Sequence, residues 1–228
     1  LIASKFAAVL EIQPENFNVL QIPGLSAATG LKMAAVAVCC GIVSILFCLA
    51  LPGVSYLYSR YLKNPYLRAA AAAVLIIAVT LLLGTADYMG AGNELIQRAI
   101  EDGKARPLDF FWKLILTALT MRAGFRGGEI VPSLCIRSSL GCAVGQALGL
   151  YAALSGAAGM VALFCGVTNC PITSILIAFE LFGFQGVSYY LIAVAISYAV
   201  SGYYSLYKDQ TIVYSKYKAK YINRHTRS

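Results

Sequence analysis

The chain has 228 residues, of which 59% are hydrophobic and 12% are charged. Soluble domains carry about twice that share of charge, so the composition excludes an ordinary soluble domain and places the chain in a bilayer. The formal net charge of +8 also does not indicate a nucleic-acid-binding protein, because the basic excess lies at the C-terminal end, in Lys208, Lys216, Lys218, Lys220, Arg224 and Arg227.

Residues 1–30 are expected to hold the end of a preceding apolar helix and a polar connection. Pro14 and Pro23 interrupt any continuous helix in this stretch. The chain opens at Leu1 and meets Glu11 before any cleavage-like pattern, which differs from a signal peptide. We therefore expect this sequence to begin inside a longer protein.

Residues 31–207 are expected to form the transmembrane part. The uncharged stretches 33–59 and 181–207 each exceed the roughly 20 residues that a helix needs to cross the hydrocarbon core. The first predicts a long helix over 31–60, and an alanine-rich helix follows over 66–84. Arg60, Lys63 and Arg68 form a basic connection between them, which the positive-inside rule places in the cytoplasm together with the tail at 208–228.

The next predicted elements are shorter. The stretch "GAGNELIQRAIEDG" predicts an amphipathic helix over 93–102, whose charged residues form a solvated face. A helix with an aromatic start is expected over 108–122. Residues 138–179 carry no charge, but glycines and Pro171 divide them into pieces of uneven length. Broken or re-entrant helices fit this pattern, so the predicted fold is an all-α polytopic membrane protein. Gly141, Gly145 and Gly149 predict close helix packing.

The sequence lacks the residue patterns that metal binding and enzyme catalysis require. The seven cysteines lie in apolar stretches without C-x-x-C spacing, and His225 is the single histidine. Neither a zinc site nor a histidine-based nucleophile is expected, and no cofactor motif is present. A membrane-embedded enzyme is disfavoured for the same reason. The cysteines are expected to be small buried hydrophobic residues.

The stretch "AGFRGGEIVPSL", residues 123–134, places Glu129 between two glycines and Pro132. The glycines permit a sharp turn, and proline suits the first turn of a helix. The N–H groups of Glu129, Ile130 and Val131 then have no helical partners and point toward any anion that can reach them. An alternative remains open, in which Glu129 complements the dipole of a helix that simply starts at the membrane interface.

Four stretches in order resemble the CLC family of anion channels and anion/proton exchangers. "GGEIVPSLCIRSSLGCAVGQALG" resembles the G-x-F-x-P signature and its following helix, and "GAGNELIQRAIEDG" resembles the short helix ahead of it. "LFCGVTNCPITSILIAFELFG" and "YKDQTIVYSKYKAK" resemble the later P-[LI]-T-x-x-x-[LI]-x-x-E helix and the final short helix. The match covers the C-terminal half of a CLC subunit.

The resemblance implies an anion site formed by Gly128, Glu129, Ile130 and Val131, with the Tyr214 hydroxyl as a further donor. The usual phenylalanine of the signature is Ile130 here, and an acid precedes it. Glu129 is then expected to act as a proton carrier or gate. A glutamate in this place resembles the fluoride-exporting branch, so fluoride (or chloride)/proton antiport is favoured over a passive gated chloride channel.

Further expectations follow from the resemblance. It implies a homodimer in the plasma membrane, with the C-terminus in the cytoplasm and the helices over 171–182 and 187–204 at the dimer contact. The other pore elements of the family precede the region that matches here, so transport requires a further N-terminal half. Glu180 is expected to be a structural partner, and Arg122 and Arg126 either attract anions or mark the membrane boundary.

Overall fold

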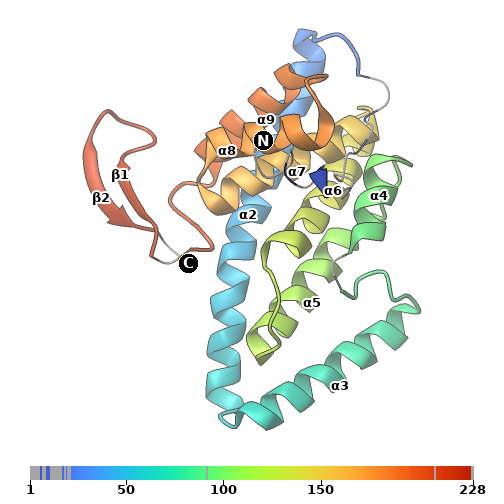
Figure 1. Ribbon diagram of the computed structural model, residues 1–228, viewed down its shortest axis with the longest axis vertical. Coiled ribbons are helices and arrows are strands. Elements are labelled where there is room, and N and C mark those ends of the chain that lie inside the picture. The colour runs from blue at the N-terminus through green and yellow to red at the C-terminus, as the bar shows by residue number, and fades with distance from the viewer. Residues whose placement is uncertain are drawn as a thin grey trace.

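A computed structural model describes residues 6, 9, 10, 17, 19, 22–90, 92–207 and 209–226. Helices dominate it, and a two-stranded hairpin lies near the C-terminus (Figure 1). In chain order the elements are α2 Ala27–Tyr61, α3 Pro65–Leu83, α4 Asn93–Ile100, α5 Asp109–Ala123, α6 Ile130–Ala147, α7 Ala152–Thr168, α8 Pro171–Phe182, α9 Val187–Val200, β1 Thr211–Tyr214 and β2 Tyr221–His225. The expected segment 1–30 lies largely outside the described residues.

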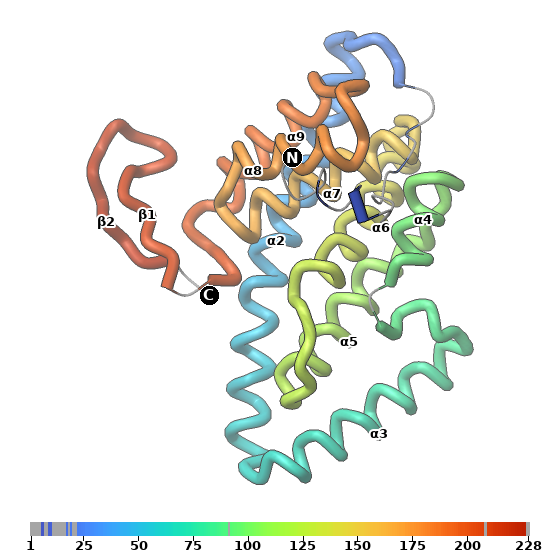
Figure 2. The backbone as a smooth tube through the Cα atoms, in the orientation of Figure 1, coloured from blue at the N-terminus to red at the C-terminus, as the bar shows by residue number. Residues whose placement is uncertain are grey.

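The long first membrane helix is confirmed as α2. It begins with a capping box, in which the Thr29 amide donates to Ser26 Oγ at 3.2 Å and the Ser26 amide donates to Thr29 Oγ1 at 2.9 Å. Within the described chain, α2 and α3 are long and apolar enough to cross a membrane by length and composition. Figure 2 follows α2 from the centre of the bundle down to its turn with α3.

Helix α3 leaves most of its apolar surface uncovered. Ala72 is its one buried residue, whereas Leu82 is 88% exposed. It packs along α5, and its N-terminal turn is held there by Arg68, whose Nε donates to the Ala123 carbonyl at 3.1 Å. An apolar helix with one narrow contact face suits a lipid environment or a further protein surface.

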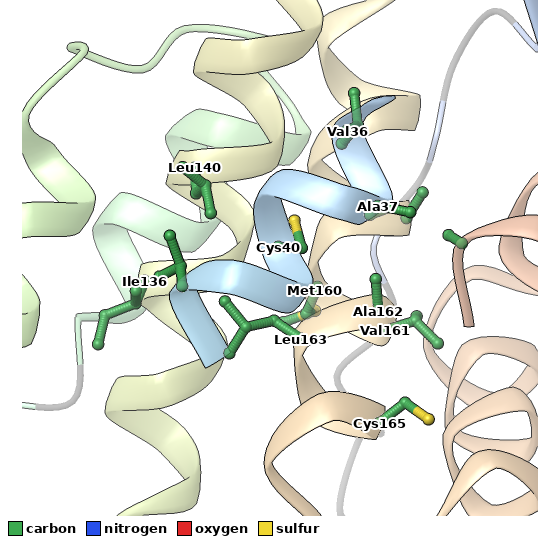
Figure 3. Close-up of a cluster of buried hydrophobic side chains, with 14 of the residues drawn as sticks. Val36, Ala37, Cys40, Ile136, Leu140, Met160, Val161, Ala162, Leu163 and Cys165 are labelled. Atoms are coloured by element: carbon green, nitrogen blue, oxygen red, sulfur yellow. The ribbon is translucent and has the colours of Figure 1, made fainter. Parts of the chain in front are cut away.

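The core lies where α2, α6 and α7 meet. Figure 3 shows Cys40 of α2, Ile136 and Leu140 of α6, and Met160 and Leu163 of α7 gathered in one apolar cluster. Helix α7 is buried along most of its length, and α9 also packs against it. The expected interruption of residues 138–179 is confirmed, because the segment is divided among α6, α7 and α8.

Glycines let α6 and α7 approach closely. A Cβ on Gly141 would lie 2.3 Å from the Ser155 carbonyl oxygen, and one on Gly159 would lie 2.8 Å from the Gly141 Cα. Gly145 also faces Ser155. The packing interpretation is therefore confirmed for Gly141 and Gly145. Gly149 differs, because its φ of +65° places it in the turn after α6.

The predicted amphipathic helix is confirmed as α4, somewhat shorter than expected. Its apolar side buries Leu95 and Ile100, and its acidic residues are exposed. Arg98 is also held by Asp87, with 3.0 Å between Nη1 and Oδ2. Burial opposes ionisation of Asp87. The hydrogen bonds from Arg98 and Thr85 and the nearby arginine charges together outweigh it, and they hold the pKa of this carboxyl below its usual value.

The expected final short helix is wrong, since this segment forms the antiparallel hairpin of β1 and β2. Thr211 pairs with His225 and Tyr214 pairs with Tyr221. The physical reason is local, because β-branched residues and a tyrosine fill β1, and β2 opens with Tyr221 and Ile222, all of which favour extended backbone. The basic residues Lys208 and Arg227 of this tail lie outside the described residues.

Lys216, between the two strands, joins the hairpin to the bundle. Its Nζ donates to the Tyr198 carbonyl at 2.9 Å and to Ser201 Oγ at 3.3 Å, and it lies 3.9 Å from the centre of the Tyr198 ring. Burial lowers the pKa of Lys216 to about 8, so the amine is still mainly charged at neutral pH. A cation at the last carbonyls of α9 is favoured by the helix dipole.

Candidate anion-binding site

The site begins with the way in which α6 starts. Gly124 has a φ of +111°, which turns the chain out of α5 into the loop at 125–129. Helix α6 then begins at Ile130, with Pro132 in its first turn. N–H groups in the first turn of a helix have no acceptor within the helix, so a proline there costs no hydrogen bond. Pro132 therefore indicates the start of α6 to within a residue or two.

The first amides of α6 are unpaired. The N–H groups of Glu129, Ile130 and Val131 make no hydrogen bond to any residue that the structure describes, and Ser133 is the first to donate, to the Glu129 carbonyl at 3.3 Å. Ile130 and Val131 are each 41% exposed. Three donors at the positive end of an 18-residue helix are the arrangement that binds anions.

Glu129 does not cap its own helix. Its side chain makes no capping hydrogen bond, and its Oε1 lies 3.3 Å from Arg122 Nη2 instead. Both side chains are about one third exposed or less, at 27% for Glu129 and 30% for Arg122. The ion pair holds the carboxylate beside the helix start while leaving the amides unoccupied.

A cavity of about 580 Å³ opens onto the same loop. Gly127, Gly128, Val131 and Pro132 form one side of it, and α3 and α5 form the others. Most of its lining residues are apolar, and the polar ones are Tyr88, Lys113, Thr117, Thr120 and Arg126. The cavity therefore places two positive side chains and two threonine hydroxyls near the unpaired end of α6.

Lys113 is a buried part of this wall that the sequence patterns did not single out. It is 1% exposed, and its Nζ donates to the carbonyls of Tyr88 at 2.9 Å and Gly90 at 2.8 Å. Tyr88 in turn donates to Asp109 Oδ1 at 2.6 Å. Burial and this hydrogen bond raise the pKa of Tyr88 to about 12, so its hydroxyl remains a donor at neutral pH. The sequence signal that could have identified Lys113 is its position as the one charged residue of the apolar run "FFWKLIL".

Replacing Lys113 with methionine is expected to destabilise the protein by about 1–3 kcal/mol, because two buried carbonyls lose their donor. The segment at 88–92 should become more susceptible to proteases, since the ammonium is its link to α5. Thermal unfolding and limited proteolysis measure the two effects. Lys104→Met is the matched control, because Lys104 is exposed. Equal unfolding temperatures for the two variants would contradict this role for Lys113.

The structure brings Gly128, Glu129, Ile130 and Val131 together, but it does not bring Tyr214 to them. Tyr214 lies in β1, is 69% exposed, and contacts Tyr221 edge to face with 6.0 Å between ring centres. Figure 1 shows the hairpin standing to one side of the helices. Glu180 lies near the end of α8 and is exposed.

Comparison with known proteins shows which proteins this chain is similar to. The sequence model of the family described as voltage gated chloride channel matches residues 1–202. A chloride/fluoride channel protein of Pseudomonas syringae pv. tomato is 31% identical over 183 residues, which cover 78% of this chain and 40% of that protein. The crystal structure of a CLC-type fluoride/proton antiporter superposes with a TM-score of 0.84 and 30% identity, over 90% of this chain and 52% of that one. The chain thus spans about half the length of these relatives or less.

Proposed function

This chain belongs to the voltage gated chloride channel (CLC) family of membrane transporters and channels, and from that membership we propose that it takes part in fluoride/proton antiport across a membrane. The observation that carries the proposal is the set of unpaired amides at Glu129, Ile130 and Val131, which lie at a helix start beside an ionisable carboxylate. Val131 and the preceding Gly127 and Gly128 also line a cavity. The role is transport and not the chemical conversion of a substrate.

The amides are proposed to hold the ion. Fluoride is small and strongly hydrated, so a site has to replace its water with well-placed donors. Backbone N–H groups fixed by the helix do this without reorganising, and Gly128 lets the ion come close because it has no side chain. Tyr214 is proposed as a further donor on the family resemblance alone, since the structure places it in the exposed hairpin and not beside the amides.

Glu129 is proposed to carry the proton or to gate the site. Ionised, its carboxylate competes for the same donors and repels an anion, whereas the protonated acid is itself a donor. Arg122 keeps the carboxylate at the helix start, within 3.3 Å. Protonation and deprotonation of this one side chain can then couple the binding of an anion to the movement of a proton at the same site.

We further propose a homodimer in the plasma membrane with a cytoplasmic C-terminus. Exposed apolar side chains on α8, such as Ile172 at 74% and Leu176 at 54%, offer a surface for a second copy. A self-complementary contact of this kind is typical of two-fold dimers. The other pore elements are proposed to come from an N-terminal half outside this sequence.

The test is ion flux in vesicles that contain the intact protein. We expect fluoride to be taken up in preference to chloride, and a proton gradient to drive fluoride against its own gradient. Fluoride- and chloride-selective electrodes follow the two anions in the same preparation. Anion movement that only dissipates gradients would support the passive gated channel instead, and a preference for chloride would overturn the fluoride assignment.

A further inference from the structure

Helix α6 carries a buried charge that the proposed site does not use. Arg137 has no exposed surface, and its Nε, Nη1 and Nη2 make no hydrogen bond to any described residue. Arginine retains its charge in proteins, and buried charges are ordinarily paired. A guanidinium with all three nitrogens unsatisfied inside a helix bundle is therefore an exception that requires a reason.

Among the residues that the structure describes, no carboxylate forms an ion pair with Arg137. The Phe164 ring of α7 lies 5.2 Å from the guanidinium carbon, and the nearby thiols of Cys48, Cys40 and Cys165 are neutral in apolar surroundings. The ion pairs of the described chain are Arg98 with Asp87 and Arg122 with Glu129. The charge of Arg137 is thus left uncompensated.

Arg137 lies close to the start of its own helix. Seven residues separate it from Ile130, which is a rise of about 10 Å, and side chains on a helix lean toward the N-terminus and shorten that distance. The guanidinium and the start of α6 therefore act on the same small region.

We propose that Arg137 is a fixed internal positive charge that attracts the transported anion to the amides at the start of α6. Glu129 and Arg122 balance each other. Arg137 therefore adds a buried positive charge to a region in which Arg126 and Lys113 are also positive. The role rests on the proposed function, because it concerns the same ion. It differs from that of the amides, which hold the ion by hydrogen bonds.

The test compares Arg137→Met with Arg137→Lys in the intact protein purified in detergent, with fluoride added as its sodium salt. A charge about 10 Å from the ion in a partly shielded interior corresponds to a change on the order of tenfold in affinity. We expect Arg137→Met to bind fluoride that much more weakly and Arg137→Lys to retain most of the affinity. Arg60→Met is the control, because Arg60 is exposed at the end of α2.

Thermal unfolding without the anion separates this role from a structural one. Removing an unpaired buried charge leaves stability unchanged or raises it, so Arg137→Met should unfold no earlier than the unsubstituted protein while losing affinity. Unchanged fluoride affinity in Arg137→Met, or an equal loss in Arg137→Lys, would overturn the inference. Fluoride that fails to stabilise or bind even the unsubstituted protein would instead overturn the proposed function.

Discussion

Replacing Glu129 with glutamine is expected to abolish the coupling between proton and anion movement while anion flux continues. Glutamine keeps the length of the side chain and an oxygen that can accept from Arg122, so the start of α6 should remain as it is. The amide group does not titrate, however, and it cannot carry a proton. We expect the proton flux that accompanies fluoride to fall at least about tenfold, because the carboxylate proposed to carry the proton is removed.

The measurement uses vesicles with the intact protein, a fluoride electrode outside and a pH-sensitive dye inside. Glu94→Gln is the matched control. It makes the same chemical change at an exposed acid of α4 that lies away from the site. The control should transport with full coupling. If Glu129→Gln still drove fluoride uphill at the expense of a proton gradient, the proton-carrier role of Glu129 would be ruled out.

Replacing Gly141 with alanine is expected to cost about 3 kcal/mol of folding free energy, because the core of α6 and α7 has no room for another carbon. The new Cβ would lie 2.3 Å from the Ser155 carbonyl oxygen and 3.0 Å from the Gly159 Cα. Both neighbours are backbone atoms, so no side chain can move aside and the two helices have to separate. Separation would also weaken the packing of α2, which touches both helices.

Thermal unfolding in detergent measures this effect, and Gly53→Ala is its control. A Cβ on Gly53 in α2 would have no atom within 4 Å, and alanine favours helix over glycine by about 1 kcal/mol. Both variants replace a helical glycine with alanine. We expect the unfolding temperature to fall for Gly141→Ala and to rise for Gly53→Ala. An unfolding temperature for Gly141→Ala at or above that of the unsubstituted protein would show that α6 and α7 do not pack as described.

The order and approximate bounds of the membrane helices could be predicted from the sequence. Most of helix α2 is one uncharged run, 33–59, which Lys32 and Arg60 bound. Helix α6 begins where Gly128 and Pro132 require it. The amide site could be predicted for the same reason, because a helix start leaves donors unpaired whatever surrounds it. These features depend on contacts among residues that are close together in the chain.

The C-terminal segment was predicted wrongly because the resemblance favoured a helix while the β-branched residues of Thr211–Tyr214 favoured a strand. The prediction for Tyr214 depended on that helix. In the hairpin its hydroxyl is carried by an exposed strand. Whether such a segment packs against the pore is determined by the rest of the fold, which local patterns do not describe.

The sequence by itself determined that this protein is a helical membrane protein of the CLC family with a helix start suited to an anion, since composition, glycine and proline act locally. Only the tertiary structure decided that Arg122 pairs with Glu129 and that Lys113 holds Tyr88 and Gly90. It also decided that Arg137 is buried with no hydrogen-bond partner among the described residues. Spacing along the chain cannot predict such pairings. They depend on which helix faces lie side by side, and in this fold the close approach of α6 and α7 at Gly141 sets those faces.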